Sequence, residues 1–147
     1  MIIKVIAKKI PEAWEVIKFA ATQADGISIK NHQSYLNELL HALLNNKAQC
    51  FLRTDKEQKN ILAVIITRLE IDKITNEKSL LLQSYYSFEP ANDKAWAENM
   101  ATAMEFAKAE KCSSITFTSL NDRILELSQF FGFEERHRRL DFKLGGT

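Results

Sequence analysis

Residues 61–69 read Ile-Leu-Ala-Val-Ile-Ile-Thr-Arg-Leu, a long stretch that is rich in β-branched side chains. Such a composition is typical of a central strand in a sheet. Two further apolar stretches flank it, at residues 48–53 and 80–88, and short polar segments separate the three. Consecutive strands joined by short polar links predict an antiparallel meander at the middle of the chain.

The segments on either side of the meander alternate between helical and extended patterns. Apolar residues recur at helical spacing in two segments before the meander, and Asn92 or Asp93 is suited to cap a helix after it. The last segment alternates Leu140, Phe142 and Leu144 with charged residues, which predicts a strand with one buried face. The expected elements besides the meander are strands at 2–7, 115–119 and 136–144 and helices at 12–24, 34–45, 92–111 and 122–131.

The resulting order, β-α-α-β-β-β-α-β-α-β, predicts a mixed α/β fold with a mostly antiparallel central sheet. The helix after the fourth strand makes the crossover to the fifth strand. We expect one domain over residues 1–147, because the chain is long enough for one core and has no linker. Residues 145–147 are expected to be a frayed tail.

The composition excludes several classes of site. With 20 basic and 19 acidic residues, the net charge of +1 provides no global basic field for nucleic acid or anionic membrane. Cys50 and Cys112 are far apart in sequence, which is unlike a disulfide framework or a zinc motif. His32, His41 and His137 are isolated, so no metal site is expected.

The N-terminal segment is not expected to be a signal peptide, because its charges follow the apolar run instead of preceding it. No stretch approaches the about 18 consecutive apolar residues that a membrane span requires. We therefore expect a soluble cytoplasmic protein without a membrane partner.

The last third of the chain carries the sharpest local motif. Asn121 directly follows the fifth expected strand, and Gly132-Phe133 follows the short helix at residues 122–131. Together with the element order, this spacing resembles the GNAT family of N-acetyltransferases over nearly the whole chain. The resemblance implies a GNAT-like fold. It also implies an acetyl-CoA site whose pyrophosphate is held by a glycine-bearing turn before the central helix.

The matching turn in this chain is residues 88–93, Phe-Glu-Pro-Ala-Asn-Asp, and no glycine occurs between Gly26 and Gly132. Glycine lets backbone N–H groups approach phosphates closely. The turn thus differs from the family pattern at the point where the cofactor's charge would bind.

The side chains of the turn differ from the pattern as well. Glu89 and Asp93 would repel a polyanion, and Pro90 removes one N–H donor. Lys94 is the remaining cation that could contact a phosphate. The tyrosine that the resemblance implies as general acid falls at Ser128, a weak acid.

The first hypothesis is therefore a degenerate GNAT-fold protein without a cofactor. It would work as a non-catalytic binding or assembly module with a protein partner. In this respect the chain resembles small GNAT-like proteins of some tailed bacteriophages, which would place it in the virion or the host cytoplasm.

The alternative is a divergent acyl-CoA-dependent N-acyltransferase that moves an acetyl group to an amine. Glu89, the acidic residue at the end of the fourth strand, would be the base, and Tyr85, Tyr86 or Ser128 would supply the acid. The resemblance implies that acetyl-CoA would contact Tyr86, Ser87, Phe88, Asn92, Asp93, Lys94 and Asn121. The alternative requires an open cleft between the fourth and fifth strands, which Tyr86 or Phe88 must not fill.

A basic edge at Arg136, Arg138 and Arg139 leaves a third, weaker hypothesis of nucleic-acid contact. Two glutamates precede these arginines, and alternation along a strand sends side chains to both faces. A solvated or partner-facing edge is therefore the favoured interpretation.

Overall fold

The structure is a computed structural model that describes residues 1–25, 31–90, 92–117, 122–134, 140 and 142–144. Its strands are β1 (Ile2–Lys4), β2 (Ala48–Thr54), β3 (Ile61–Ile71), β4 (Lys78–Ser87) and β5 (Ser114–Phe117). Its helices are α1 (Ile10–Asp25), α2 (His32–Leu44), α3 (Asp93–Ala109) and α4 (Asp122–Phe130), and a 3-10 turn, η1 (Ala7–Lys9), precedes α1.

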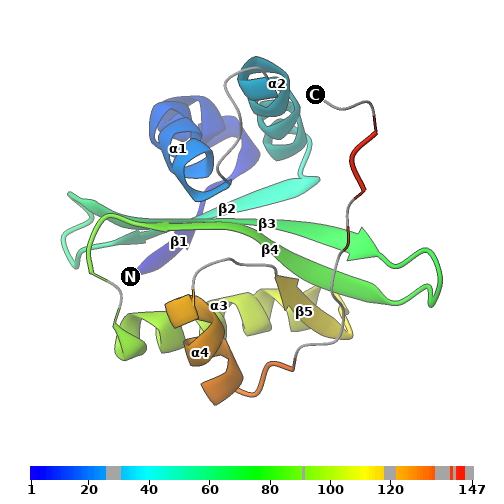
Figure 1. Cartoon of the computed structure of the whole chain (residues 1–147). Helices are drawn as coiled ribbons and strands as arrows, with labels where there is room; N and C mark the ends of the chain where they lie inside the picture. The colour runs from blue at the N-terminus through cyan, green and yellow to red at the C-terminus, as the bar shows by residue number, and fades with distance from the viewer. Residues whose placement is uncertain (26–30, 91, 118–121, 135–139, 141, 145–147) are drawn as a thin grey trace.

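The strands form one mixed sheet in sequence order, β1-β2-β3-β4-β5. The first four strands are antiparallel to their neighbours, and β5 runs parallel to β4. A parallel pair needs a crossover, and α3 provides it. Helices α1 and α2 lie on one face of the sheet, whereas α3 and α4 lie on the other (Figure 1). The predicted mixed α/β fold is confirmed.

The core is divided between the two faces of the sheet. The larger cluster packs Ile17 of α1 and Leu39 of α2 against Ile66 of β3. Smaller clusters lie under α3, around Leu80 and around Trp96. Burial on both faces explains why the β3 sequence lacks polar-apolar alternation.

A one-residue bulge interrupts β4 at Gln83. Ile66 pairs with Ser84 and Thr67 pairs with Leu82, so Gln83 is the extra residue of the ladder. The last pair of β4 with β5 in the described ranges, Leu82 with Phe117, also lies here. A bulge bends a strand and increases its twist. Among the residues that the structure describes, the β4–β5 pairing therefore extends only as far as the bulge.

The Gln83 side chain is held from the α2 face of the sheet. It accepts a hydrogen bond from Arg68 Nε and donates one to the Tyr35 hydroxyl at 3.3 Å. Arg68 in turn forms two hydrogen bonds to Glu38, at 2.7 and 2.6 Å. The hydrogen bond from Arg68 lowers the pKa of Glu38. This polar network fixes the position of the bulge.

Two expected elements differ from the structure. The first strand ends at Lys4 instead of residue 7, because residues 7–9 form η1. In the expected last strand, Leu140, Phe142 and Leu144 lie outside any strand and are 92%, 89% and 88% exposed. The prediction that they are buried is wrong, because alternation selects a face of a strand without supplying a neighbouring strand. The rest of 136–144 and the expected tail at 145–147 lie outside the described residues.

The core assignment predicts a large contrast between two aliphatic truncations. Leu39 is 0% exposed and Ile74 is 95% exposed. Leu39→Ala should lower the free energy of unfolding by about 2–5 kcal/mol, since it leaves a cavity. The control Ile74→Ala should change it by less than about 0.5 kcal/mol. Urea denaturation measures both, and equal midpoints for the two variants would contradict the assigned core.

Candidate functional site

The site begins at the outer edge of β4, beyond the bulge. Phe88 N–H donates to the Leu62 carbonyl of β3 at 2.8 Å, and the register pairs Tyr86 with Val64. Hydrogen bonding alternates along an antiparallel strand, so the N–H and C=O groups of Tyr85 and Ser87 point away from β3. In the described part of the chain, the β4–β5 ladder does not reach these residues. An edge of this kind can pair with an extended chain that carries amides.

Alternate side chains of this half-strand point to opposite faces of the sheet. The Tyr85 ring packs edge-on against Trp96 of α3, with 5.4 Å between centroids. The Tyr86 ring packs edge-on against Phe19 of α1, at 5.7 Å. Tyr85 therefore faces α3, and Tyr86 and Phe88 face α1. Tyr86 and Phe88, which the acyltransferase alternative required to leave the space between β4 and β5 unfilled, pack with Phe19 on the α1 face.

Trp96 and Phe133 instead pack where β4 and β5 separate. Trp96 belongs to the cluster that includes Tyr85 and Phe133, and the Phe133 ring contacts Phe117 at 5.1 Å. The two rings form an apolar floor between α3 and the separating strands. Trp96 is buried there and packs the start of α3 against the sheet.

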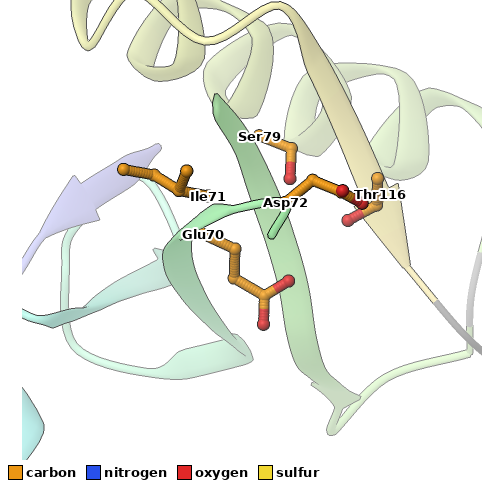
Figure 2. Close-up of a pocket in the computed structure, with 5 residues that line it drawn as sticks. All are labelled: Glu70, Ile71, Asp72, Ser79 and Thr116. Carbon is orange, nitrogen blue, oxygen red and sulfur yellow. The ribbon is translucent and has the colours of Figure 1, made fainter. Parts of the chain in front are cut away.

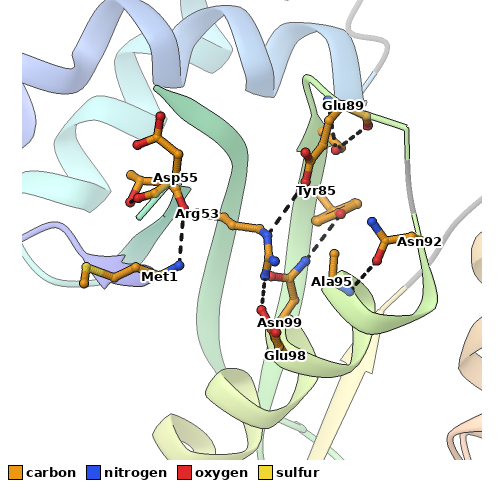
Figure 3. Close-up of polar contacts among 11 residues, drawn as sticks. Met1, Arg53, Asp55, Tyr85, Glu89, Asn92, Ala95, Glu98 and Asn99 are labelled. Atoms are coloured by element: carbon orange, nitrogen blue, oxygen red, sulfur yellow. Dashed lines mark hydrogen bonds and ion pairs between the residues drawn. The ribbon is translucent and has the colours of Figure 1, made fainter. Parts of the chain in front are cut away.

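A polar network surrounds Tyr85 on the α3 face (Figure 3). Asn99 Nδ2 donates to the Tyr85 hydroxyl at 3.4 Å. Arg53 Nη1 donates to Glu98 at 2.7 Å, and Arg53 Nε lies 3.9 Å from Glu89. The network thus joins β2, β4, α3 and the turn after β4. It brings together Tyr85 and Glu89, two of the residues that the sequence proposed.

Protonation differs between the members of this network. Burial raises the pKa of Tyr85 above its usual value, although hydrogen bonds with Ser87 and Asn99 and the charge of Arg53 act in the opposite direction. The hydrogen bond from Arg53 lowers the pKa of Glu98. Tyr85 is therefore a protonated phenol at neutral pH, and Glu98 is the carboxylate that neutralises Arg53. The phenol is thus available to donate a proton.

Within the part of the chain that the structure describes, three buried polar atoms in this region lack a hydrogen-bond partner: Arg53 Nε, Trp96 Nε1 and Asn99 Oδ1. Trp96 and Asn99 are only 5% and 4% exposed. Their residues all adjoin Tyr85, through a ring contact, a hydrogen bond and a charge interaction. Because buried polar atoms in proteins are almost always bonded, this group marks a place where polar groups of a ligand or water would be bound.

The start of α3 is capped by Asn92, one of the two residues that the sequence offered. Asn92 Oδ1 accepts from Ala95 N–H at 2.8 Å, and the Asn92 carbonyl accepts from Trp96 N–H at 3.1 Å. These bonds use two of the amides at the helix terminus. Asp93 and the exposed Lys94 occupy the first turn. The terminus therefore offers phosphate a lysine and a helix dipole beside one carboxylate.

The remaining predicted site residues either lie elsewhere in the structure or fall outside the described residues. Ser128 is buried on α4, and its carbonyl accepts from the N–H groups of Phe131 and Phe133, which ends the helix. Asn121 lies outside the described residues, as do the arginines of the expected basic edge, Arg136, Arg138 and Arg139.

Sequence reasoning missed Arg53 and Asn99. Arg53 follows the apolar residues Cys50-Phe-Leu of β2, and Asn99 shares the buried face of α3 with Trp96 and Met100. A polar residue in an apolar pattern was the available signal, because such a residue needs a partner when it is buried.

A concave region lies at the other end of the β3–β4 pair. It is a shallow pocket of about 380 Å³ lined by Glu70, Ile71, Asp72, Ser79 and Thr116 (Figure 2). Asp72 Oδ1 accepts from the N–H groups of Ile74 and Thr75 and thereby shapes the hairpin turn. In the described ranges, no three His, Cys, Asp or Glu side chains are grouped so as to hold a metal ion.

Comparisons with known proteins identify the fold. No protein-family model matches the sequence, and no curated protein matches it. Among solved structures, the chain is similar to a probable acetyltransferase with a TM-score of 0.70 and 14% identity, over 100% of this chain and 99% of the other. A predicted acetyltransferase with acetyl-CoA from Clostridium acetobutylicum has a TM-score of 0.72 and 16% identity, over 98% and 96% of the two chains.

An aminoglycoside N-acetyltransferase in complex with CoA is also similar, with a TM-score of 0.69 and 15% identity over 97% of this chain and 93% of the other. At these identities the likeness shows the fold alone. The chain therefore has the fold of the GNAT acetyltransferases. Among the helices in the described ranges, none is long and apolar enough to cross a membrane.

The raised pKa of Tyr85 predicts a specific dependence of stability on pH. The neutral phenol is favoured in the folded state, so its contribution to stability is present below about pH 10 and is lost as the pH rises through the folded pKa. NMR titration of ¹³Cζ-labelled tyrosine should show the Tyr85 resonance, assigned with Tyr85→Phe, titrating above pH 10. Titration at or below pH 10 would contradict the buried environment.

Proposed function

We propose that this protein is an acyltransferase that moves an acyl group, such as acetyl, from the thioester of CoA to an amine. The observation that carries the proposal is the outer edge of β4 at Tyr85 and Ser87, next to the buried Tyr85 phenol and the Glu89 carboxylate. The acetyltransferases of the same fold support it, since two of the similar structures are complexes with acetyl-CoA or CoA.

The residues fit the arm of acyl-CoA better than its pyrophosphate. The arm carries two amides, which match the N–H and C=O groups of Tyr85 and Ser87 in the manner of an added strand. The orphaned atoms Trp96 Nε1 and Asn99 Oδ1 provide one donor and one acceptor nearby. At the phosphate end, Lys94 and the dipole of α3 provide attraction that Asp93 weakens. We therefore expect most of the recognition to come from the arm.

The thioester supplies an activated acyl carbon when it is bound. Glu89 accepts a proton from the incoming amine, either directly or through water, and the nitrogen forms a bond to that carbon. As the carbon–sulfur bond breaks, the Tyr85 hydroxyl gives its proton to the departing sulfur. Glu89 then holds one proton that Tyr85 lacks, and exchange with solvent restores both groups.

Tyr85 is assigned as the acid because of its position relative to the other candidates. Its hydroxyl lies within the network of Arg53 and Glu89, whereas Tyr86 packs on the opposite face with Phe19. Ser128 lies at the end of α4, and a serine hydroxyl is a far weaker acid than a phenol. Glu89 is the base because Glu98 is bound at 2.7 Å by Arg53.

A non-catalytic binding module remains the second candidate. Asp93 at the start of α3 favours it, as do large apolar side chains that are strongly exposed, such as Phe130 and Leu140. Exposed apolar groups suit a protein partner when they form a patch. An origin in a bacteriophage virion stays a prediction from the sequence resemblance.

Calorimetric titration with acetyl-CoA and with CoA separates the two candidates. The transferase should bind acetyl-CoA more tightly than about 100 µM, which corresponds to about 5.5 kcal/mol. The absence of heat at millimolar concentrations of both compounds would contradict the transferase.

Once an acceptor is found, release of the CoA thiol measures turnover. Tyr85→Phe should lower kcat by about 100-fold or more at an unchanged affinity for acetyl-CoA, because it removes the acid and keeps the ring. The matched control Tyr86→Phe should leave kcat within about twofold. If the two phenylalanine variants lost activity equally, the assignment of Tyr85 would be wrong.

A further inference from the structure

The Arg53 side chain crosses the α3 face of the sheet from β2 toward β4. The strand register pairs Arg53 with Ala63 of β3, and Ala63 with Ser87 of β4, so the three residues form one row across the sheet. The row spans two strand spacings, or about 10 Å. Because Ala63 offers only a methyl group at its centre, the guanidinium can pass over β3 and approach Glu89, which follows β4.

The guanidinium of Arg53 lies between two carboxylates and bonds them unequally (Figure 3). Nη1 donates to Glu98 at 2.7 Å, whereas Nε lies 3.9 Å from Glu89. Within the described part of the chain Nε has no hydrogen-bond partner, and only 14% of the side chain is exposed. A buried N–H without a partner is unfavourable, so it will bond an anion that forms within its reach. Arg53 therefore has one donor in use and one in reserve.

The proposed transfer moves a negative charge around this guanidinium. At the start Glu89 and Glu98 are carboxylates and Tyr85 is a neutral phenol. Once Glu89 has taken the proton of the amine and Tyr85 has given its proton to the sulfur, Glu89 is neutral and Tyr85 is a phenolate. Two anions and one guanidinium give the group one net negative charge both before and after the transfer. A fixed cation near both positions lowers the energy needed to move the charge.

We propose that Arg53 is a positioning residue of the transfer reaction, which holds Glu89 and Tyr85 around one guanidinium and stabilises the phenolate that Tyr85 becomes. The inference rests on the proposed transfer reaction and adds to it a residue that acts through the acid and the base. Glu98 orients the guanidinium by a charge-assisted hydrogen bond and offsets part of its charge. Lys94 and the N-terminal ammonium group act on Glu98 in the same direction as Arg53.

The titration of Tyr85, followed by NMR of ¹³Cζ-labelled tyrosine without any ligand, tests the electrostatic part. Arg53→Gln should move the titration to higher pH, because the phenolate loses its cation. Glu98→Gln should move it to lower pH, because the charge of Arg53 is then less neutralised. The matched control Lys59→Gln, which removes an exposed cation paired with Glu57, should leave it unchanged. Looser packing alone would lower the pKa of Tyr85 in both variants, since it would expose the phenol.

Turnover of acetyl-CoA with n-butylamine, a simple primary amine, tests the catalytic part. Arg53→Gln should lower kcat about tenfold or more and leave KM for acetyl-CoA within about twofold, because the guanidinium stabilises a charge that forms during the reaction. Arg53→Lys keeps the charge and loses the planar fork, so it should recover part of the loss. The lysine variant also provides the comparison if Arg53→Gln does not fold.

The outcomes separate this inference from the reaction on which it rests. An unchanged or lower Tyr85 titration in Arg53→Gln overturns the role of Arg53, and so does a kcat equal to that of the wild type. Binding of acetyl-CoA in that case leaves the transferase standing without this residue. Opposite shifts in the two variants, with no binding of acetyl-CoA to the wild type, would contradict the transfer reaction and with it the role of Arg53 in turnover.

Discussion

The bulge at Gln83 separates β4 into two halves with different neighbours. Before it, β4 pairs with β3 and with β5. Beyond it, β3 is the neighbour of β4 among the described residues, and the polar groups of Tyr85 and Ser87 point away from β3. The network of Gln83, Arg68 and Glu38 holds this geometry from the opposite face of the sheet. The placement of Tyr85 and Ser87 at the candidate site depends on this register of β4.

The second half of β4 also assigns different chemistry to its two faces. On the α3 face, Tyr85 is surrounded by Trp96, Asn99 and Arg53, which are buried polar partners suited to proton transfer. On the α1 face, Tyr86 lies among partly exposed aromatic rings. A strand with period two delivers alternate side chains to the two sides, so one segment contributes to two different environments.

The turn before α3 contains no glycine, so we expect the pyrophosphate of acyl-CoA to contribute less to binding than its amide arm. Families that bind a pyrophosphate through backbone N–H groups rely on a close approach, which a glycine permits. Here Asn92 caps the helix with its own side chain, and Asp93 follows. We therefore place the binding energy along the edge of β4 and not at the helix terminus. The proposed site therefore differs from a glycine-bearing pyrophosphate site, because its affinity would come mainly from the edge of β4.

Much of the fold could be predicted from local patterns, since residues 61–69 indicated a central strand and Asn92 a helix cap. These features depend on neighbours in sequence. The failures involve distant partners. Leu140, Phe142 and Leu144 alternate like a strand yet are exposed, because alternation supplies no pairing edge. Arg53 and Asn99 were missed because only the tertiary fold brings β2 and α3 to Tyr85. The sequence identified Tyr85 as a candidate but could not identify its neighbours in space.

In the proposed transferase, the outer edge of β4 binds the amide arm of an acyl thioester. Titration of the ¹⁵N-labelled protein with acetyl-CoA tests it most directly, through the backbone amide resonances. The account predicts that the amides of Tyr85 and Ser87 shift most, and that the amide of Phe88, which is bonded to Leu62, shifts little. Unchanged Tyr85 and Ser87 resonances at millimolar acetyl-CoA would contradict the account.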